Sequence, residues 1–139
     1  MRRVVVDPGV LVSAIISPLG PPADILRAAA QGRVALVVCP HLLAELLGVL
    51  RREKFRSYLT IEEAERYVAG VASRAETRPD PQAVAPITRD PKDDYLIALA
   101  REAGVGAIVS GDADLLVLER VDPPILSPVR LLEELAEPS

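Results

Sequence analysis

The fold is organised around one stretch of the chain, Asp90-Pro-Lys-Asp-Asp-Tyr-Leu-Ile-Ala-Leu-Ala-Arg-Glu-Ala-Gly-Val-Gly-Ala-Ile-Val-Ser-Gly-Asp-Ala-Asp114. It reads as acidic residues, an apolar helix, a glycine turn, a short apolar strand and acidic residues again. In an open parallel sheet, ligands bind outside the carboxyl ends of the strands. We therefore expect the acids at both ends of this stretch to share one edge of a sheet.

The composition favours a single domain over residues 1–139. The chain is 50% hydrophobic, and a chain of this size buries roughly two thirds of its unfolded surface. No apolar run reaches the roughly 20 residues that a membrane helix needs, and no signal-peptide pattern is present, so we expect a soluble cytoplasmic protein without a membrane partner. The net charge of -4 argues against a general basic coat for nucleic acids.

Strand and helix patterns alternate along the chain. Arg2–Val6 is a β-branched run that ends at Asp7, which is typical of a strand buried on both faces. Further strands are predicted over 34–38, 107–110 and 124–126, with a short strand at 86–89 and a loop or edge segment at 77–85. Helices are predicted over 23–31, 41–52, 60–74, 92–103, 112–118 and 128–135. The alternation predicts an α/β fold in which helices flank a parallel sheet of about five strands.

Two acids follow predicted strands. Asp7 ends the first strand, and Asp112 follows the strand Ala107–Ser110 after one glycine, so parallel neighbouring strands would bring both to the same edge. Crowded carboxylates repel unless a proton or a cation neutralises them, and Mg2+ or Mn2+ prefers carboxylate oxygen and water. A single histidine and a single cysteine argue against zinc. Alternatively, acids after a strand and a glycine only start helices.

The acids of the predicted helices allow two interpretations each. Glu45 is either a solvated glutamate on a polar helix face or a carboxylate within an apolar stripe, where it would meet a cation. Steps of three and four residues from Asp93 meet only apolar or small residues, whereas steps from Asp94 lead to Ala98 and Arg101. Asp93 is therefore expected to point inward at the helix start, where the helix dipole favours negative charge. Asp94 is expected to cap the helix or to be exposed.

Five segments occur in a characteristic order along the chain. They are Val-Val-Val-Asp7, Pro40-His-Leu-Leu-Ala-Glu45-Leu-Leu-Gly-Val-Leu50 with Lys54-Phe55, Asp90-Pro-Lys-Asp93-Asp-Tyr-Leu-Ile-Ala-Leu-Ala100, Ile108-Val-Ser-Gly-Asp112-Ala-Asp-Leu-Leu116 and Ile125-Leu-Ser-Pro128. Together they resemble PIN-domain proteins over nearly the whole chain, and more narrowly the toxin components of toxin–antitoxin systems.

The resemblance implies a Rossmann-like sheet and a metal-dependent endoribonuclease that hydrolyses RNA phosphodiester bonds with Mg2+ or Mn2+. Carried over by position, the catalytic and metal-binding acids are Asp7, Glu45, Asp93 and Asp112. Further candidates at the same site are Asp94, Ser110 and Asp114. The family usually follows its first acid with Thr-Asn, whereas this chain has Pro8-Gly9. An amide side chain that helps to order the acids in relatives is therefore absent.

An acidic site repels RNA, so cations elsewhere must guide the RNA backbone. The candidates are Arg51, Arg52, Lys54, Arg56, Arg89 and Lys92, each of which is alternatively a solvated surface residue. The resemblance also implies a small antitoxin partner and a homodimer. The predicted helices 23–31 and 61–74 are candidate contact surfaces, although burial in the core explains their apolar residues equally well.

Two other functions remain open. A non-catalytic PIN-like module that binds RNA or protein would keep the fold and lose the metal, and the Pro8-Gly9 departure favours it as the alternative. A phosphate-transfer enzyme with an aspartyl nucleophile also begins with an acid at a strand end. Such an enzyme would need a lysine near the last acids, and the only lysines are Lys54 and Lys92.

Overall fold

The computed structural model describes residues 1–82, 84–86, 91–116, 118 and 121–137, with the backbone alone at 91, 92 and 114. Residues 87–89 of the predicted strand 86–89 and the candidate side chains of Arg89, Lys92 and Asp114 lie outside the described residues. Within them, the predicted α/β class is confirmed.

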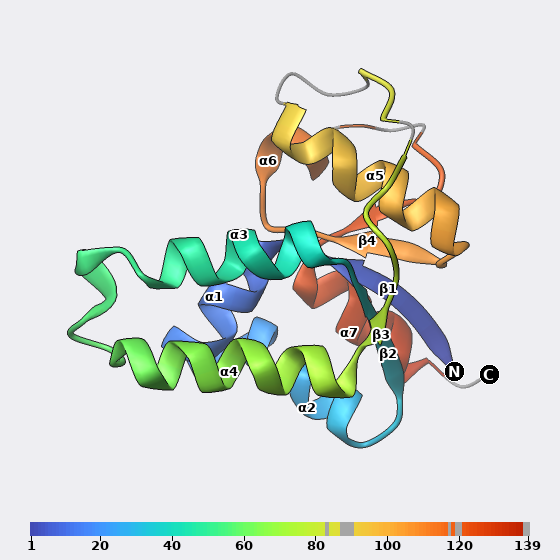
Figure 1. Ribbon diagram of the computed structural model, residues 1–139. Helices are drawn as coiled ribbons and strands as arrows, with labels where there is room; N and C mark the ends of the chain where they lie inside the picture. Colours follow the sequence, from blue (N-terminus) through green and yellow to red (C-terminus); the bar gives the residue numbers. More distant parts are fainter. Residues whose placement is uncertain (83, 87–90, 117, 119–120, 138–139) are drawn as a thin grey trace.

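Five parallel strands form one sheet in the order β3-β2-β1-β4-β5 (Figure 1). The strands are β1 (Arg2–Val6), β2 (Val34–Val38), β3 (Glu76–Thr77), β4 (Ala107–Val109) and β5 (Ile125–Leu126). β1 lies at the centre, and Val4, Val5 and Val6 are at most 3% exposed. The β-branched run therefore became a strand covered on both faces, as its pattern predicts.

The helices pack on both faces of the sheet and along one side of it (Figure 1). They are α1 (Pro8–Ile16), α2 (Pro21–Ala30), α3 (Pro40–Leu50), α4 (Ile61–Arg74), α5 (Pro91–Ala103), α6 (Ala113–Leu116) and α7 (Pro128–Ala136), with a 3-10 turn at Glu53–Phe55. α5 lies against β1 and β4, whereas α2 packs against α1, α7 and β2. α3 and α4 form an antiparallel pair that projects away from the sheet.

No single helix in the described part of the chain is long and apolar enough to cross a membrane. α1 and α2 together have the necessary length and composition, but the chain bends by 95° between them.

Local sequence signals explain most helix ends. The Thr60 hydroxyl accepts from the Glu63 backbone N–H at 3.1 Å, and the Glu63 carboxylate accepts from the Thr60 N–H at 2.9 Å. This capping box starts α4. Gly32 follows α2 with φ 76° and Gly104 follows α5 with φ 68°, a conformation that side chains with a Cβ disfavour.

The segment directly after Asp7 is helical. α1 begins at Pro8 itself, and Asp7 is its N-cap. A proline is tolerated in the first helical turn because the N–H that it lacks has no partner within the helix there. The edge interpretation of residues 77–85 is confirmed in part, since Thr77 pairs with β2 as the end of the edge strand β3.

Candidate functional site

The carboxyl ends of β1 and β4 lie side by side, as the acid pattern predicts. Val6 is in register with Val109, and the Asp7 N–H donates to the Val109 carbonyl at 2.9 Å. The next residues on the two strands are therefore neighbours: the Ser110 hydroxyl donates to Asp7 Oδ2 at 2.9 Å. Ser110 is fully buried, and its oxygen also accepts from the Asp112 N–H at 3.0 Å. One hydroxyl thus connects the first and the last candidate acid.

Asp7, Asp93 and Asp112 line one open hollow of about 400 Å³ at this edge. They come from the end of β1, the first turn of α5 and the loop after β4. The rest of the wall comes from α1 and from the first residues of α2 and α7. Several helix amino termini therefore meet at the acids. Their partial positive charge offsets part of the repulsion between the carboxylates.

Asp7 is oriented by backbone and hydroxyl donors. Its Oδ1 accepts from the Gly9 N–H at 2.9 Å, while Oδ2 accepts from Ser110. Both carboxylate oxygens are thus held without the amide side chain that the family pattern carries after the first acid. The backbone of Gly9 supplies one of the donors, so the Pro8-Gly9 departure leaves Asp7 fixed in place.

Glu45 lies apart from the wall of this hollow, beside a tyrosine of α5. It is half-buried on α3, and its Oε2 accepts from the Tyr95 hydroxyl at 2.8 Å. The ring of Tyr95 packs edge-on against His41, with 4.4 Å between the ring centroids. Burial raises the pKa of Tyr95, and so do the hydrogen bond to Glu45 and the charges of Glu45 and Asp7. This hydroxyl therefore stays a hydrogen-bond donor at neutral pH.

The two neighbouring acids of α5 take different positions. Asp93 is half-buried and lines the hollow with Asp7 and Asp112. Of the two expected placements of Asp94, as a helix cap or as an exposed residue, the exposed one is wrong, because Asp94 is only 4% exposed. α5 is covered on more than its sheet side: Ala98 is 8% exposed, and Arg101 Nε donates to the Asp122 carbonyl of the segment before β5. The spacing of residues along α5 does not reveal that this other side of the helix is also covered by protein.

The donor set suits a hard divalent cation. Within the described residues, no three or more His, Cys, Asp or Glu side chains are arranged to hold one metal ion together. Mg2+ usually keeps several of its waters and uses only one or two carboxylates directly. Three carboxylates around one open hollow suit such a hydrated ion, and hard oxygen donors do not favour zinc.

The described candidates for RNA contact lie at the far end of the α3–α4 pair, away from the hollow. Arg51, Arg52 and Lys54 are exposed there, and an Arg51 Nη2 lies 3.9 Å from Glu65 Oε2. Arg56 differs from these three, because its guanidinium donates to the Leu50 carbonyl at the end of α3 and has two buried nitrogens. The Arg56 side chain therefore stabilises the turn that follows α3.

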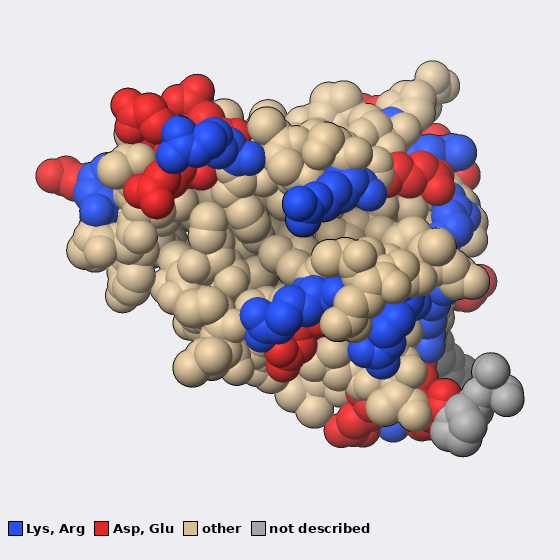
Figure 2. Space-filling view, turned by 90° about the horizontal axis from the view of Figure 1, so that it is seen from below, with Lys and Arg blue, Asp and Glu red and all other residues tan. Residues whose placement is uncertain are grey.

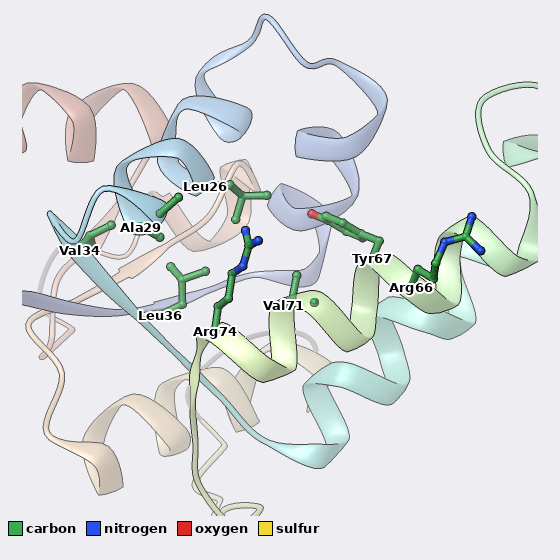
Figure 3. A pocket seen from close by; sticks show the side chains of 10 residues that line it. Leu26, Ala29, Val34, Leu36, Arg66, Tyr67, Val71 and Arg74 are labelled. Atoms are coloured by element: carbon green, nitrogen blue, oxygen red, sulfur yellow. The ribbon is translucent and has the colours of Figure 1, made fainter.

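A second hollow of about 220 Å³ lies between α2, β2 and α4 (Figure 3). Leu26 and Ala29 of α2, Val34 and Leu36 of β2, and Val71 and Tyr67 of α4 give it a mainly apolar wall. Arg74 extends from α4 toward Leu26, and Arg66 lies at one end. We call it the α2–α4 groove.

The sheet order and the acids at its carboxyl edge define a Rossmann-like α/β domain, a class in which ligands bind outside the carboxyl ends of the strands. A sequence model of the PIN domain matches residues 3–114, which include all four candidate acids. The chain belongs to the PIN domain family.

Three individual proteins are similar to this chain in sequence or in fold. An uncharacterized protein of Methanocaldococcus jannaschii, MJ1680, is 29% identical over 116 residues, which cover 84% of this chain and 74% of that protein. The crystal structure of PAE2754 from Pyrobaculum aerophilum matches 98% of this chain and 90% of its own, with a TM-score of 0.62 and 17% identity. VapBC2 from Rickettsia felis, solved with a fragment of promoter DNA, matches 89% of this chain and 96% of its own, with a TM-score of 0.60 and 17% identity. These structures share the fold.

Proposed function

We propose that the protein is a metal-dependent endoribonuclease that hydrolyses RNA phosphodiester bonds with Mg2+ or Mn2+. One observation carries the proposal: carboxylates of three separate segments, Asp7, Asp93 and Asp112, line one hollow at the carboxyl edge of the sheet. Membership of the PIN domain family supports it. RNA is the proposed substrate and the cytoplasm the proposed place of action.

Each side chain has a stated part in this proposal. Asp7, Asp93 and Asp112 hold the ion, which, when bound, supplies an acidified water and stabilises the negative charge that develops on the phosphodiester. Ser110 keeps Asp7 aimed by donating to its Oδ2, and keeps the start of the loop at Asp112 in place by accepting from its N–H. The helix amino termini around the hollow favour anionic groups there, the scissile phosphate included.

Replacing Asp112 with Asn tests the proposal most directly. The substitution keeps the size of the side chain and removes its charge, so we expect Mn2+-dependent cleavage of RNA to be lost while the circular dichroism spectrum is unchanged. Asp122→Asn is the matched control, because Asp122 is exposed and lies outside the hollow. Cleavage would be followed on defined RNAs, with a chelator added to one arm. An Asp112→Asn protein that cuts as fast as the parent contradicts the proposal.

A binding module without catalysis is the second candidate function. One observation favours it: no described group of acids is already arranged as a complete set of metal ligands. Such a module would show no rise in melting temperature with Mn2+. The nuclease proposal requires a rise, because an ion that binds only the folded state stabilises it.

We further propose that the protein is the toxin of a toxin–antitoxin pair, in keeping with the family and with the fold shared with VapBC2. The two helices expected from the sequence as contact surfaces, α2 and α4, flank the α2–α4 groove. Its apolar wall and Arg74 suit an amphipathic segment of the antitoxin that carries an acidic residue. The homodimer stays a prediction that size-exclusion chromatography with light scattering would test.

A further inference from the structure

We propose that Tyr95 is a positioning residue for the reaction, which holds the Glu45 carboxylate so that Glu45 can join the three acids of the hollow in serving the ion. The inference rests on the proposed nuclease function. It assigns to Glu45 a partner that comes from the same helix as Asp93.

The contact between Tyr95 and Glu45 joins α5 to α3. Tyr95 is 6% exposed on α5, and its hydroxyl donates to Glu45 Oε2 of α3 at 2.8 Å. A phenol has a single O–H donor, and an ionised carboxylate only accepts, so this hydrogen bond has a fixed direction. His41, one turn before Glu45 on α3, packs edge-on against the tyrosine ring at an interplanar angle of 86°. α3 therefore contacts the Tyr95 side chain twice, through His41 at the ring and through Glu45 at the hydroxyl.

Glu45 needs such a donor because of its neighbours. Leu42 and Leu46 on the same helix are fully buried, and Glu45 itself is half-buried. A carboxylate that leaves water without a hydrogen bond is unfavourable, so an unpartnered Glu45 would turn outward to solvent. The Tyr95 hydroxyl offsets this penalty on the inner side of α3, which keeps the negative charge there.

The same hydroxyl links Glu45 to the hollow. Tyr95 follows Asp93 by two residues on α5, and Asp93 lines the hollow with Asp7. The charges of Glu45 and of Asp7 both act on the Tyr95 hydroxyl and favour its protonated form. The Tyr95 hydroxyl therefore lies within electrostatic reach of both acids. Because Oε2 accepts from Tyr95, Oε1 of Glu45 would be the oxygen that serves the ion.

Tyr95→Phe removes the hydroxyl and keeps the ring against His41. We expect the Mn2+ dissociation constant, measured by electron paramagnetic resonance of free Mn2+, to rise by about 10-fold, the lower end of what loss of an outer-sphere partner causes. Tyr58→Phe is the control for the same chemical change, because Tyr58 is 62% exposed on the α3–α4 connection, and it should bind Mn2+ as the parent does.

A double-substitution cycle shows whether Tyr95 acts through Glu45. If it does, Glu45→Gln weakens Mn2+ binding, and adding Tyr95→Phe to Glu45→Gln weakens it no further. In the RNA cleavage assay, Tyr95→Phe should lower kcat at saturating RNA and leave KM for RNA unchanged, since the hydroxyl contacts no substrate in this proposal. A general loss of packing would instead add to the effect of Glu45→Gln.

The outcomes separate this inference from the proposed function. Suppose that the parent cuts no RNA but binds Mn2+, and that Tyr95→Phe weakens this binding. That result overturns the nuclease proposal and supports the role of Tyr95. Cleavage by the parent together with unchanged Mn2+ binding in Tyr95→Phe, or a further loss in the Glu45→Gln background, overturns the inference alone. A parent that binds no Mn2+ overturns both.

Discussion

The two hollows of this molecule are opposite in character although both border the same sheet. The hollow at the carboxyl edge has three acids and several helix amino termini in its wall, whereas the α2–α4 groove is apolar with two arginines. In the proposed function, this small α/β domain separates chemistry from recognition: the acids gather where strands end, and the apolar surface lies between α2 and α4 beside β2.

The surface around the groove supports this contrast. Seen from the side of α2 and α4, the molecule is mostly uncharged, with separate basic groups near the middle and acidic groups gathered toward the far end of the α3–α4 pair (Figure 2). The exposed acids of that end include Glu53, Glu62 and Glu65. The cations at the far end of the α3–α4 pair lie among these acids. Arg66 and Arg74 at the groove are therefore the clearer basic group on this side of the molecule.

The largest expected effect comes from Asp7, where site and fold depend on one residue. Asp7→Ala should lower Mn2+-dependent cleavage by more than about 100-fold, because even outer-sphere partners change activity by 10–100-fold. The variant also loses the N-cap of α1, which stabilises by about 0.5–2 kcal/mol. Asp112 is exposed and precedes only the four-residue helix α6, and Asn starts a helix as well as Asp does. Urea unfolding should therefore show a loss of stability for Asp7→Ala and none for Asp112→Asn.

Equal unfolding free energies for these two variants would contradict the placement of Asp7 as a cap. Repulsion between crowded carboxylates, taken by itself, predicts that removing either acid leaves the fold intact or more stable. The structure revises this for Asp7, whose two oxygens accept from Gly9 and Ser110.

An intermediate effect is expected from Arg74→Glu in the groove. Reversing this charge should weaken binding of the protein encoded by the adjacent gene by about 10-fold or more, if that protein places an acidic residue there, because like charges at an interface repel. RNA cleavage should be unchanged, since Arg74 lines the α2–α4 groove and does not line the acidic hollow.

Arg33→Glu is the matched control, because Arg33 is exposed and lies outside the groove. Binding would be measured by titration calorimetry. Reduced cleavage in Arg74→Glu would show that the two hollows are not independent.

The smallest effect concerns Cys39, which follows β2 at the same edge as the acids. Burial raises the pKa of this thiol to about 11, so about one thiol in a thousand is ionised at pH 8, compared with roughly one in four for a free cysteine. A disulfide reagent should react much more slowly with the native protein than with protein in urea. Equal rates would show that this part of the edge opens to solvent, unlike the wall of the acidic hollow.

The sheet was predictable because its signals are local. The valine run of β1 and the acids after β1 and β4 each lie within a few residues, and the parallel pairing of those strands brings Asp7 and Asp112 to one hollow. The capping box of α4 is equally local.

The remaining features depend on contacts between distant segments. The hydrogen bond from Tyr95 to Glu45 spans 50 positions, and the burial of Asp94 depends on more than the face of α5 that meets the sheet. Arg56 matched the basic pattern for RNA contact, yet its guanidinium is used by the turn after α3. No periodicity within one helix reports such partners.

The prolines that open α1, α2 and α7 have a consequence for substrate choice. Pro8, Pro21 and Pro128 begin the helices whose first turns border the acidic hollow. A proline ring fixes φ before folding, so these turns have little freedom left to lose when a ligand arrives. The conformation of the rim is therefore fixed before binding, and in the proposed function the RNA must adapt its own conformation to the rim. Unpaired, flexible strands would then be admitted more readily than stiff duplexes.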